Sequence, residues 1–216
     1  MSGIIAQNTL DSSGLIKSPE GGGGAWTFIK KITASASSDV SFVDGTSSVV
    51  LDGTYKLYVI YCNNIHLATD NQNLQVNFSL DTWSNYNVTK TTTAFDAYQA
   101  ESGGGAVGYN AGSDLAQGTG AQLLTYEVNA GADADQSCSG IMYLYDPANT
   151  TFTKKFSWIG SFSAYANYSV NTFVSGICNT TSAVDAVQFT STSGNIDAGD
   201  FVLLGLTIWV ELYRKT

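Results

Sequence analysis

The sequence is poor in charged residues, and this shortage limits the partners that the protein can bind. Charged residues make up 12% of the 216-residue chain, roughly half the usual share of a globular protein. Nine basic and eighteen acidic residues give a formal net charge of −9. A surface of this sign repels phosphate backbones and anionic lipid headgroups. We therefore expect neither nucleic acid nor a membrane as a partner.

Cysteine and histidine are also scarce, which argues against a metal centre. The three cysteines, Cys62, Cys138 and Cys178, are far apart and form no CxxC pair. Cys62 and Cys178 lie in apolar, β-branched or aromatic runs, where cysteine acts as a small hydrophobic residue. We expect buried free thiols. His66, the single histidine, has no second histidine with which to bind zinc, and we expect it to make an ordinary hydrogen bond.

No motif for catalysis or cofactor binding is present. The stretch GGGAVGYNAGSD lacks the lysine and adjacent Ser or Thr with which a phosphate loop binds phosphate. Asp133 and Asp135 lack the EF-hand spacing and its final glutamate, so an acidic surface loop is expected there. No feature singles out a carboxylate pair for glycoside hydrolysis. We predict a protein that is not an enzyme and holds no cofactor or metal.

Long hydrophobic segments are missing as well. The longest, FVLLGLTIWV at 201–210, is well below the roughly 20 residues of a membrane helix. The N-terminal stretch MSGIIAQNTLDSSGLIK has neither a basic n-region nor an apolar h-region of adequate length. We expect a soluble protein that first folds in a cytoplasm.

Alternation of apolar and polar residues is the dominant pattern. In LQVNFSL one face is apolar, with Leu74, Val76, Phe78 and Leu80, and the other is polar. In the C-terminal run, Val202, Leu204 and Leu206 share one face, while the opposite face is also fairly apolar. That run is therefore expected to be a central strand or a subunit contact.

Further strands are expected at 25–33, 39–43, 54–63, 121–129, 138–146, 151–160, 170–179 and 183–191. Clusters of Gly, Asn, Asp and Ser separate them, with loops expected at 101–114 and 193–200 among others. No segment longer than about ten residues has a helical period. The prediction is an all-β, two-sheet antiparallel sandwich of jelly-roll-like or related Greek-key type.

Residues 1–24 differ from the remainder, 25–216, which we treat as one β-sandwich domain. Their isolated apolar residues offer little area with which to order the segment, so an extended arm is expected that is disordered alone or docks on another molecule. Four glycines then form a hinge at which the chain can leave the sandwich at an angle that bulkier residues resist. The candidate assembly residues are Ile4, Ile5, Leu10, Leu15, Ile16, Gly21, Gly22, Gly23 and Gly24.

Four aromatic residues in turn-like contexts are candidates for recognition. Trp83 and Tyr86 lie in DTWSNYN, and Tyr165 and Tyr168 lie in SAYANYS. Aromatic rings desolvate cheaply and keep a polar edge, so these residues could contact sugar rings or a protein partner. The alternative is that they cover the ends of the core.

Five stretches together resemble a family of structural proteins from phages of marine bacteria, and they cover most of the chain. They are SSGLIK at 12–17, HLATDNQNLQVNFSLDTWSNYNVTKTTTAFDAY at 66–98, GYNAGSDLAQGTG at 108–120, LYDPANTTFTKKF at 144–156 and SGNIDAG at 193–199. Relatives in that family end soon after a short Ile/Leu-rich strand, whereas this chain continues through LTIWVELYRKT.

The resemblance implies a virion component that folds in the host cytoplasm before assembly. The leading hypothesis is a homotrimeric capsid decoration or cement protein that binds the major capsid protein or other virion proteins through its arm. The main alternative is a receptor-binding adhesin at a tail-fibre tip, in which the loop aromatics bind host surface glycan. A cell-encoded lectin or polysaccharide hydrolase is a third hypothesis.

Overall fold

The computed structural model describes residues 26–206, which form twelve strands and no helix. Every strand pairing is antiparallel. No helix in this part of the chain could cross a membrane. The strands are β1 (Trp26–Ser37), β2 (Asp39–Val43), β3 (Leu57–Leu67), β4 (Leu74–Ser79), β5 (Lys90–Ala100), β6 (Gly105–Tyr109), β7 (Gln122–Leu123), β8 (Cys138–Tyr145), β9 (Lys154–Ala164), β10 (Tyr168–Cys178), β11 (Ala186–Ser191) and β12 (Ile196–Leu206).

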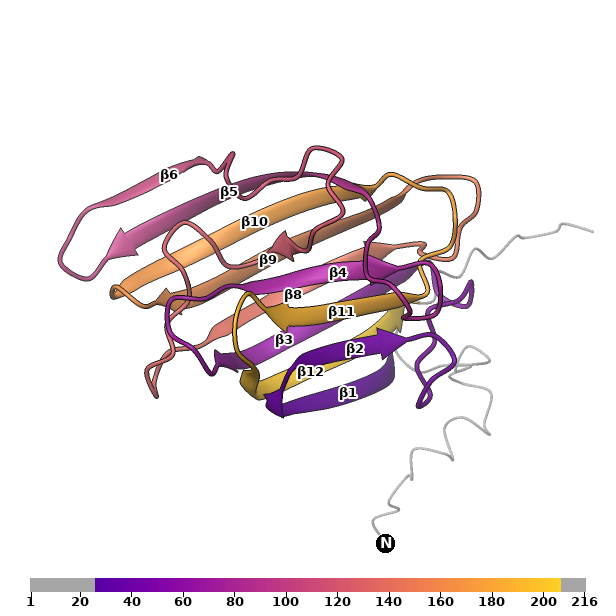
Figure 1. Ribbon diagram of the computed structural model, residues 1–216, viewed down its shortest axis with the longest axis horizontal. Helices are drawn as coiled ribbons and strands as arrows, with labels where there is room; N and C mark the ends of the chain where they lie inside the picture. Colours follow the sequence, from indigo (N-terminus) through magenta and orange to yellow (C-terminus); the bar gives the residue numbers. More distant parts are fainter. Residues whose placement is uncertain (1–25, 207–216) are drawn as a thin grey trace, which may run out of the picture.

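Two sheets pack as a sandwich (Figure 1). The large sheet has eight strands in the order β1-β12-β3-β8-β9-β10-β5-β6, and the small sheet has the order β2-β11-β4-β7. The predicted all-β antiparallel sandwich is confirmed. Jelly-roll connectivity is not confirmed, because β8, β9 and β10 stay neighbours in one sheet and the sheets contain eight and four strands.

The small sheet covers only part of the large one, and the segment 110–137, which is irregular apart from the two residues of β7, covers much of the rest. The hydroxyl of Tyr126 donates to the carbonyls of Phe95 and Phe173 at 2.9 and 2.8 Å. The hydroxyl of Thr172 donates to the carbonyl of Leu124 at 2.7 Å. In Figure 1 this segment crosses the inner side of β9, β10 and β5. Because it supplies hydrogen bonds, this half of the core tolerates polar residues that an apolar layer would exclude.

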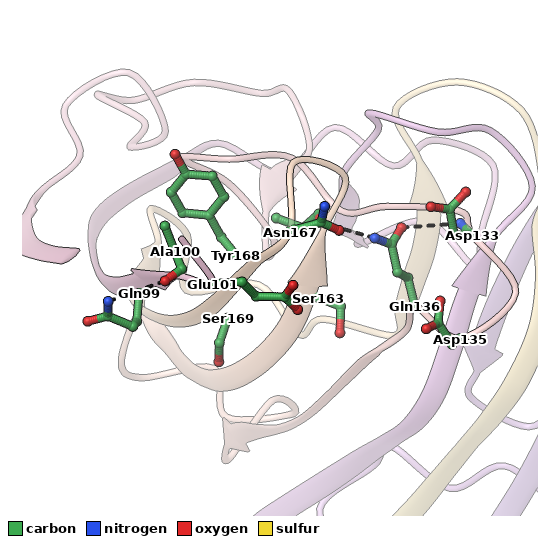
Figure 2. Close-up of a pocket in the computed structure, with 11 residues that line it drawn as sticks. Gln99, Ala100, Glu101, Asp133, Asp135, Gln136, Ser163, Asn167, Tyr168 and Ser169 are labelled. Atoms are coloured by element: carbon green, nitrogen blue, oxygen red, sulfur yellow. Dashed lines mark hydrogen bonds between the residues drawn. The ribbon is translucent and has the colours of Figure 1, made fainter. Parts of the chain in front are cut away.

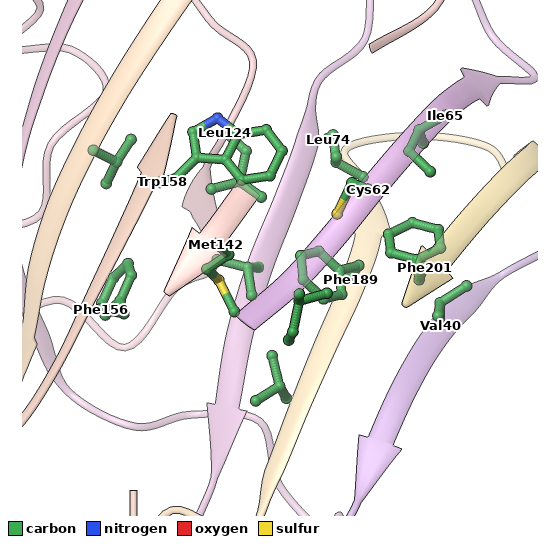
Figure 3. Close-up of a cluster of buried hydrophobic side chains, with 14 of the residues drawn as sticks. Val40, Cys62, Ile65, Leu74, Leu124, Met142, Phe156, Trp158, Phe189 and Phe201 are labelled. Carbon is green, nitrogen blue, oxygen red and sulfur yellow. The ribbon is translucent and has the colours of Figure 1, made fainter. Parts of the chain in front are cut away.

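The centre of the core consists of aromatic and aliphatic side chains from both sheets (Figure 3). Phe189 of the small sheet packs on Phe201 of the large sheet, with ring centroids 5.1 Å apart. The indole of Trp158 lies across the inward faces of Gly140 and Gly160, where a Cβ would overlap the ring. These glycines therefore leave the space in which the largest side chain of the core is buried.

The prediction for LQVNFSL is largely confirmed by β4. Leu74, Val76 and Phe78 are fully buried, but Leu80 lies beyond the strand and is 38% exposed, so its assignment to the buried face is wrong. The alternation predicts that the polar face is exposed to solvent, but Asn77 and Ser79 on that face are buried as well.

The C-terminal run was expected to be either a central strand or a subunit contact. It contains a central strand, because β12 lies between β1 and β3. Its core-facing residues are Phe201 and Leu203, both fully buried, whereas Val202 and Leu204 face outward and are half-buried. The strand also begins at Ile196, so the loop expected at 193–200 is wrong over most of its length.

Two further expectations fail. Strand β5 was not among the expected strands, and β6 lies within the loop expected at 101–114. Conversely, the strand expected at 121–129 is reduced to the two residues of β7. The three cysteines are buried free thiols, as predicted. The proposed arm and hinge, from Ile4 to Gly24, and the chain after Leu206 lie outside the described residues.

Candidate docking surfaces

The loop at 80–89, which follows β4, carries the most exposed tryptophan of the described chain. Trp83 is 51% exposed, and its neighbour Leu80 is 38% exposed. The loop is held by Asp81, whose carboxylate accepts bonds from the hydroxyl of Ser79 at 2.8 Å and from the backbone and side-chain amides of Asn85 at 2.9 and 2.7 Å. The hydrogen bonds from Asn85, reinforced by Ser79, hold the pKa of Asp81 below its ordinary value. Trp83 is thus presented from a braced loop.

The backbone beneath Trp83 adopts an uncommon conformation. Thr82 and Trp83 have φ values of 57° and 67°, in the left-handed region that non-glycine residues rarely occupy. The amide of Thr82 donates to the carboxylate of Asp185 at 2.8 Å, and the amide of Trp83 donates to the hydroxyl of Ser79 at 3.2 Å. Such backbone strain persists only where the surrounding structure enforces it, and it clusters at ligand-binding sites.

Tyr86 belongs to the same loop but is oriented differently from Trp83. Its side chain is half-buried, and burial raises the pKa of its hydroxyl. Its carbonyl accepts a hydrogen bond of 2.6 Å from the side-chain amide of Asn77. Of the two loop aromatics selected from DTWSNYN, Trp83 is therefore the one that a partner can reach.

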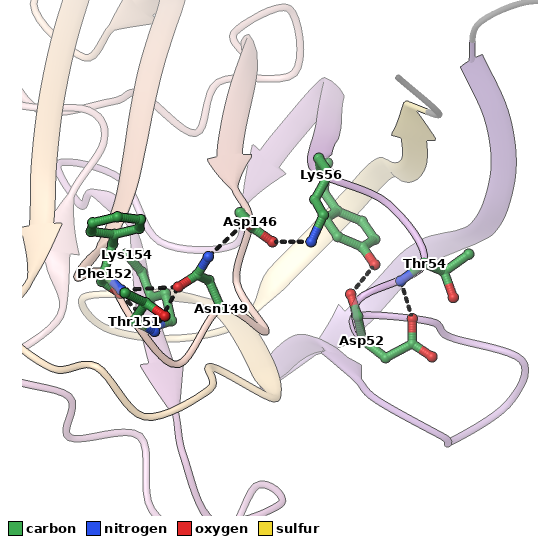
Figure 4. A network of polar contacts seen from close by, with 9 residues as sticks. Asp52, Thr54, Lys56, Asp146, Asn149, Thr151, Phe152 and Lys154 are labelled. Carbon is green, nitrogen blue, oxygen red and sulfur yellow. Dashed lines mark hydrogen bonds and ion pairs between the residues drawn. The ribbon is translucent and has the colours of Figure 1, made fainter. Parts of the chain in front are cut away.

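A second exposed aromatic, Phe152, lies in the connection between β8 and β9 and was missed by the sequence analysis. It is 67% exposed at the end of a turn that Figure 4 shows in detail. The side-chain oxygen of Asn149 accepts bonds from the amides of Thr151 and Phe152 at 2.7 and 2.9 Å, and its nitrogen donates to Asp146 at 2.9 Å. An ion pair of 3.1 Å joins Asp146 to Lys56.

The loops of Trp83 and Phe152 meet the same connecting segment, between β10 and β11. The amide of Val184 donates to the carbonyl of Pro147 at 3.0 Å, while Asp185 binds the amide of Thr82. The first and last described residues, Trp26 and Leu206, pair with each other at this end of the sandwich, in register with Leu57 and Tyr145. Residues 1–25 are therefore joined to the sandwich at the end that carries Trp83 and Phe152, which we call the docking end.

Tyr165 and Tyr168 lie at the opposite end of the sandwich, Tyr165 in the turn between β9 and β10 and Tyr168 as the first residue of β10. Ala130 forms isolated β-bridges with Ala164, the last residue of β9, and with Gln72, just before β4. This turn is therefore near the start of β4, whereas Trp83 follows the end of β4. Tyr165 is 44% exposed. Tyr168 is half-buried and packs edge-on against Tyr98 at 5.6 Å. The four aromatic candidates thus do not form one surface.

Tyr168 also lines a pocket of about 370 Å³ (Figure 2). Its charged residues are Glu101, Asp133 and Asp135, but no group of three metal-binding side chains gathers anywhere in residues 26–206. The ring of His66 lies 3.3 Å from the carbonyl of Asp133, which agrees with the ordinary hydrogen bond expected of it. Asp133 and Asp135 form part of the acidic wall of this pocket.

Two buried lysines flank a buried cysteine on the inner face of the large sheet. Cys178 pairs across strands with Lys90 of β5 and Lys154 of β9. All three side chains are almost completely buried. Burial raises the pKa of Cys178 to about 12, opposite to the low pKa of a nucleophilic thiol. The cluster is sealed from substrates, and its lysines bind carbonyl oxygens of the chain.

The chain matches no known protein-family model, no curated protein and no solved structure. The functional proposal therefore depends on the surfaces of the sandwich itself.

Proposed function

We propose that this protein is a non-enzymatic structural component of a phage virion, a capsid decoration or cement protein that forms homo-oligomers. One observation supports it above the others: two exposed aromatic residues on braced loops stand at the end of the sandwich to which residues 1–25 are joined. A surface of this kind fits attachment to a protein shell, because rigid aromatic residues bury a large area at low entropic cost.

The proposed attachment divides into two parts. The arm would bind through its apolar residues, and the docking end would contribute Trp83 and Phe152. Burial of one large apolar side chain is worth about 1.5–3 kcal/mol, so the two aromatic residues add about 3–6 kcal/mol before the costs of association. Several copies in one oligomer multiply the effect, since the later contacts form at high effective concentration.

The experiment is a co-sedimentation assay with particles that lack the protein. Trp83→Ala and Phe152→Ala should each weaken binding about tenfold or more, and removal of residues 1–20 should abolish it. Tyr165→Ala is the matched control, because Tyr165 is similarly exposed at the opposite end of the sandwich. Full binding by the arm deletion and by both docking-end variants would overturn the proposed attachment.

A second function, receptor binding at a tail-fibre tip, is favoured by the exposure and bracing of Trp83 in particular. A tryptophan ring held over a fixed backbone can stack on a sugar ring. In this case the isolated protein should bind host surface glycan on an array, Trp83→Ala should lose the signal, and Phe152→Ala should keep it. An array on which the wild-type protein gives no signal would contradict glycan binding and leave shell attachment as the proposed function.

A further inference from the structure

One row of apolar side chains crosses the outer face of the large sheet, the face turned away from the small sheet. Strand register places seven residues side by side on seven successive strands, from β12 to β6. We call them the outer stripe: Val202, Tyr61, Ile141, Ile159, Phe173, Phe95 and Tyr109. Each comes from a separate strand, so no short sequence segment reveals the row.

The outer stripe is partly open to solvent. Ile159 is 49% exposed, Phe95 44% and Tyr109 60%. Phe95 and Phe173 stack with ring centroids 4.7 Å apart and planes 6° apart, so this part of the row is flat. Next to it an open groove of about 510 Å³ is lined by Tyr61, Ile141 and Ile159 together with uncharged polar side chains.

The positions that flank the outer stripe are almost free of charge. On one side they include Ser157, Ser175 and Thr93, and on the other Ser161 and Asn171. Among the outward positions of β3, β8, β9, β10, β5 and β6, Lys155 is the single lysine, and none is Asp, Glu or Arg. On β12 the carboxylate of Asp200 lies on this face, where it is paired with Lys31 of β1 at 2.7 Å. From β3 to β6, a chain of net charge −9 therefore has a broad face without carboxylates.

We propose that a second copy of this chain packs on the outer face, with the outer stripe at the centre of the contact. This contact would be the one through which the homo-oligomer of the proposed function forms, and the inference rests on that proposed function for its biological role. Charge favours this occupant, because the repulsion between two copies of charge −9 is weakest when they meet on surfaces that carry no negative charge. From β3 to β6 both surfaces meet that condition, and at the β12 edge the carboxylate of Asp200 is already paired with Lys31, so neither copy buries an unpaired carboxylate.

The size of the face also suits a stable contact between copies. Seven strands at about 4.8 Å spacing span about 29 Å, and a strand of 11 residues, the length of β3, β5, β9, β10 and β12, reaches about 36 Å. The product is on the order of 1,000 Å², compared with about 800 Å² per partner in a standard interface. The flanks of Ser, Thr and Asn match the polar rim that surrounds an apolar interface centre.

Sedimentation velocity of the full chain between about 1 and 100 μM tests this contact. The wild type should form oligomers, and Ile159→Lys should raise the dissociation constant at least tenfold, because it places a charge at the centre of the contact. Tyr165→Lys makes the same change of charge at a similarly exposed residue off this face and should leave the constant unchanged. A wild type that is monomeric at 100 μM, or an Ile159→Lys variant that associates normally, would overturn the proposal.

Hydroxyl-radical footprinting of the unmodified protein gives a second measurement that does not depend on variant folding. Labelling of Tyr61, Tyr109 and Ile159 should fall at least threefold as concentration rises, while labelling of Tyr165 stays constant. Association without protection of the stripe would place the contact elsewhere and overturn the inference. Both measurements use the isolated protein, so they can succeed even when the protein is absent from virions and the proposed function fails.

Discussion

The side-chain nitrogen of Lys90 lies 2.6 Å from Oδ1 of Asn77, inside the sandwich and without a carboxylate among its hydrogen-bond partners. Its other partner is the carbonyl of Val88 at 2.7 Å. Burial lowers the pKa of Lys90 to about 8, because neutral oxygens only partly replace the hydration of an ammonium group. The fold therefore opposes protonation of this side chain.

This burial predicts that the contribution of Lys90 to stability rises between about pH 8 and about pH 10.5, whereas the buried thiols, whose pKa values are raised, contribute with the opposite sign above pH 9. In that interval the unfolded chain, with an ordinary lysine pKa of 10.5, holds a proton that the folded protein has released at Lys90, so the contribution of this side chain to the free energy of unfolding increases with pH. The gain is at most about 3 kcal/mol. Urea denaturation of wild type and Lys90→Met at several pH values isolates the contribution, with Lys155→Met as a control for net charge. Parallel curves for wild type and Lys90→Met would contradict this account of Lys90.

The packing of Trp158 predicts that two glycine substitutions in strands differ in their effect on stability. Gly160→Ala places a methyl group into the indole and should cost about 1–3 kcal/mol, the usual cost of overpacking. Gly108→Ala should change stability by no more than about 0.5 kcal/mol, because nothing lies near its Cβ position. Thermal or urea denaturation compares them. Equal losses of stability for the two variants would show that the packing of the Trp158 indole does not require the absence of a side chain at Gly160.

Asp81 is predicted to order the Trp83 loop only while it is ionised. In Asp81→Ala, amide hydrogen exchange over residues 80–88 should accelerate at least tenfold, while β4 keeps its protection. Since the pKa of Asp81 is lowered in the folded protein, its contribution is complete above the ordinary value of 3.8 and is lost as pH falls through the lower value. Unchanged exchange in the variant would mean that the Asp185 contact alone holds the loop.

The three thiols are predicted to be unreactive in the folded protein. Cys62, Cys138 and Cys178 are buried, and desolvation raises the pKa of each thiol, so little thiolate forms at neutral pH. Treatment with a chromogenic disulfide at pH 8 should label none of them within minutes, and all three after denaturation. Rapid labelling of one thiol in the native protein would identify an opening that the packed core does not account for.

The comparison of β4 with β5 explains how far the sequence determines the strands. In β4, Leu74, Val76 and Phe78 alternate cleanly, and the strand is recognisable. In β5 the inward positions include Lys90 and Asp96, both buried, so the hydrophobic period disappears. These polar residues are tolerated because partners come from distant parts of the chain, such as Asn77 for Lys90.

The candidate surfaces were only partly predictable for a related reason. Trp83 was recognisable as an aromatic residue in a turn-like segment. Phe152 was assigned to a strand, and its exposure depends on the turn that Asn149 closes. The outer stripe requires the register of seven strands, and contacts such as Tyr61 with Ile141 join residues far apart in the sequence. Asn149 followed by Thr150 and Thr151 is the local signal that could have indicated an exposed turn.

Immunogold electron microscopy of purified phage particles, with antibody against this protein, tests the proposed function most directly. The account predicts many labels distributed over the capsid, and their loss when residues 1–20 are deleted from the protein. A few labels confined to the tail would replace shell attachment with receptor binding through Trp83. Particles without any label, from cells that contain the protein, would contradict a structural role in the virion.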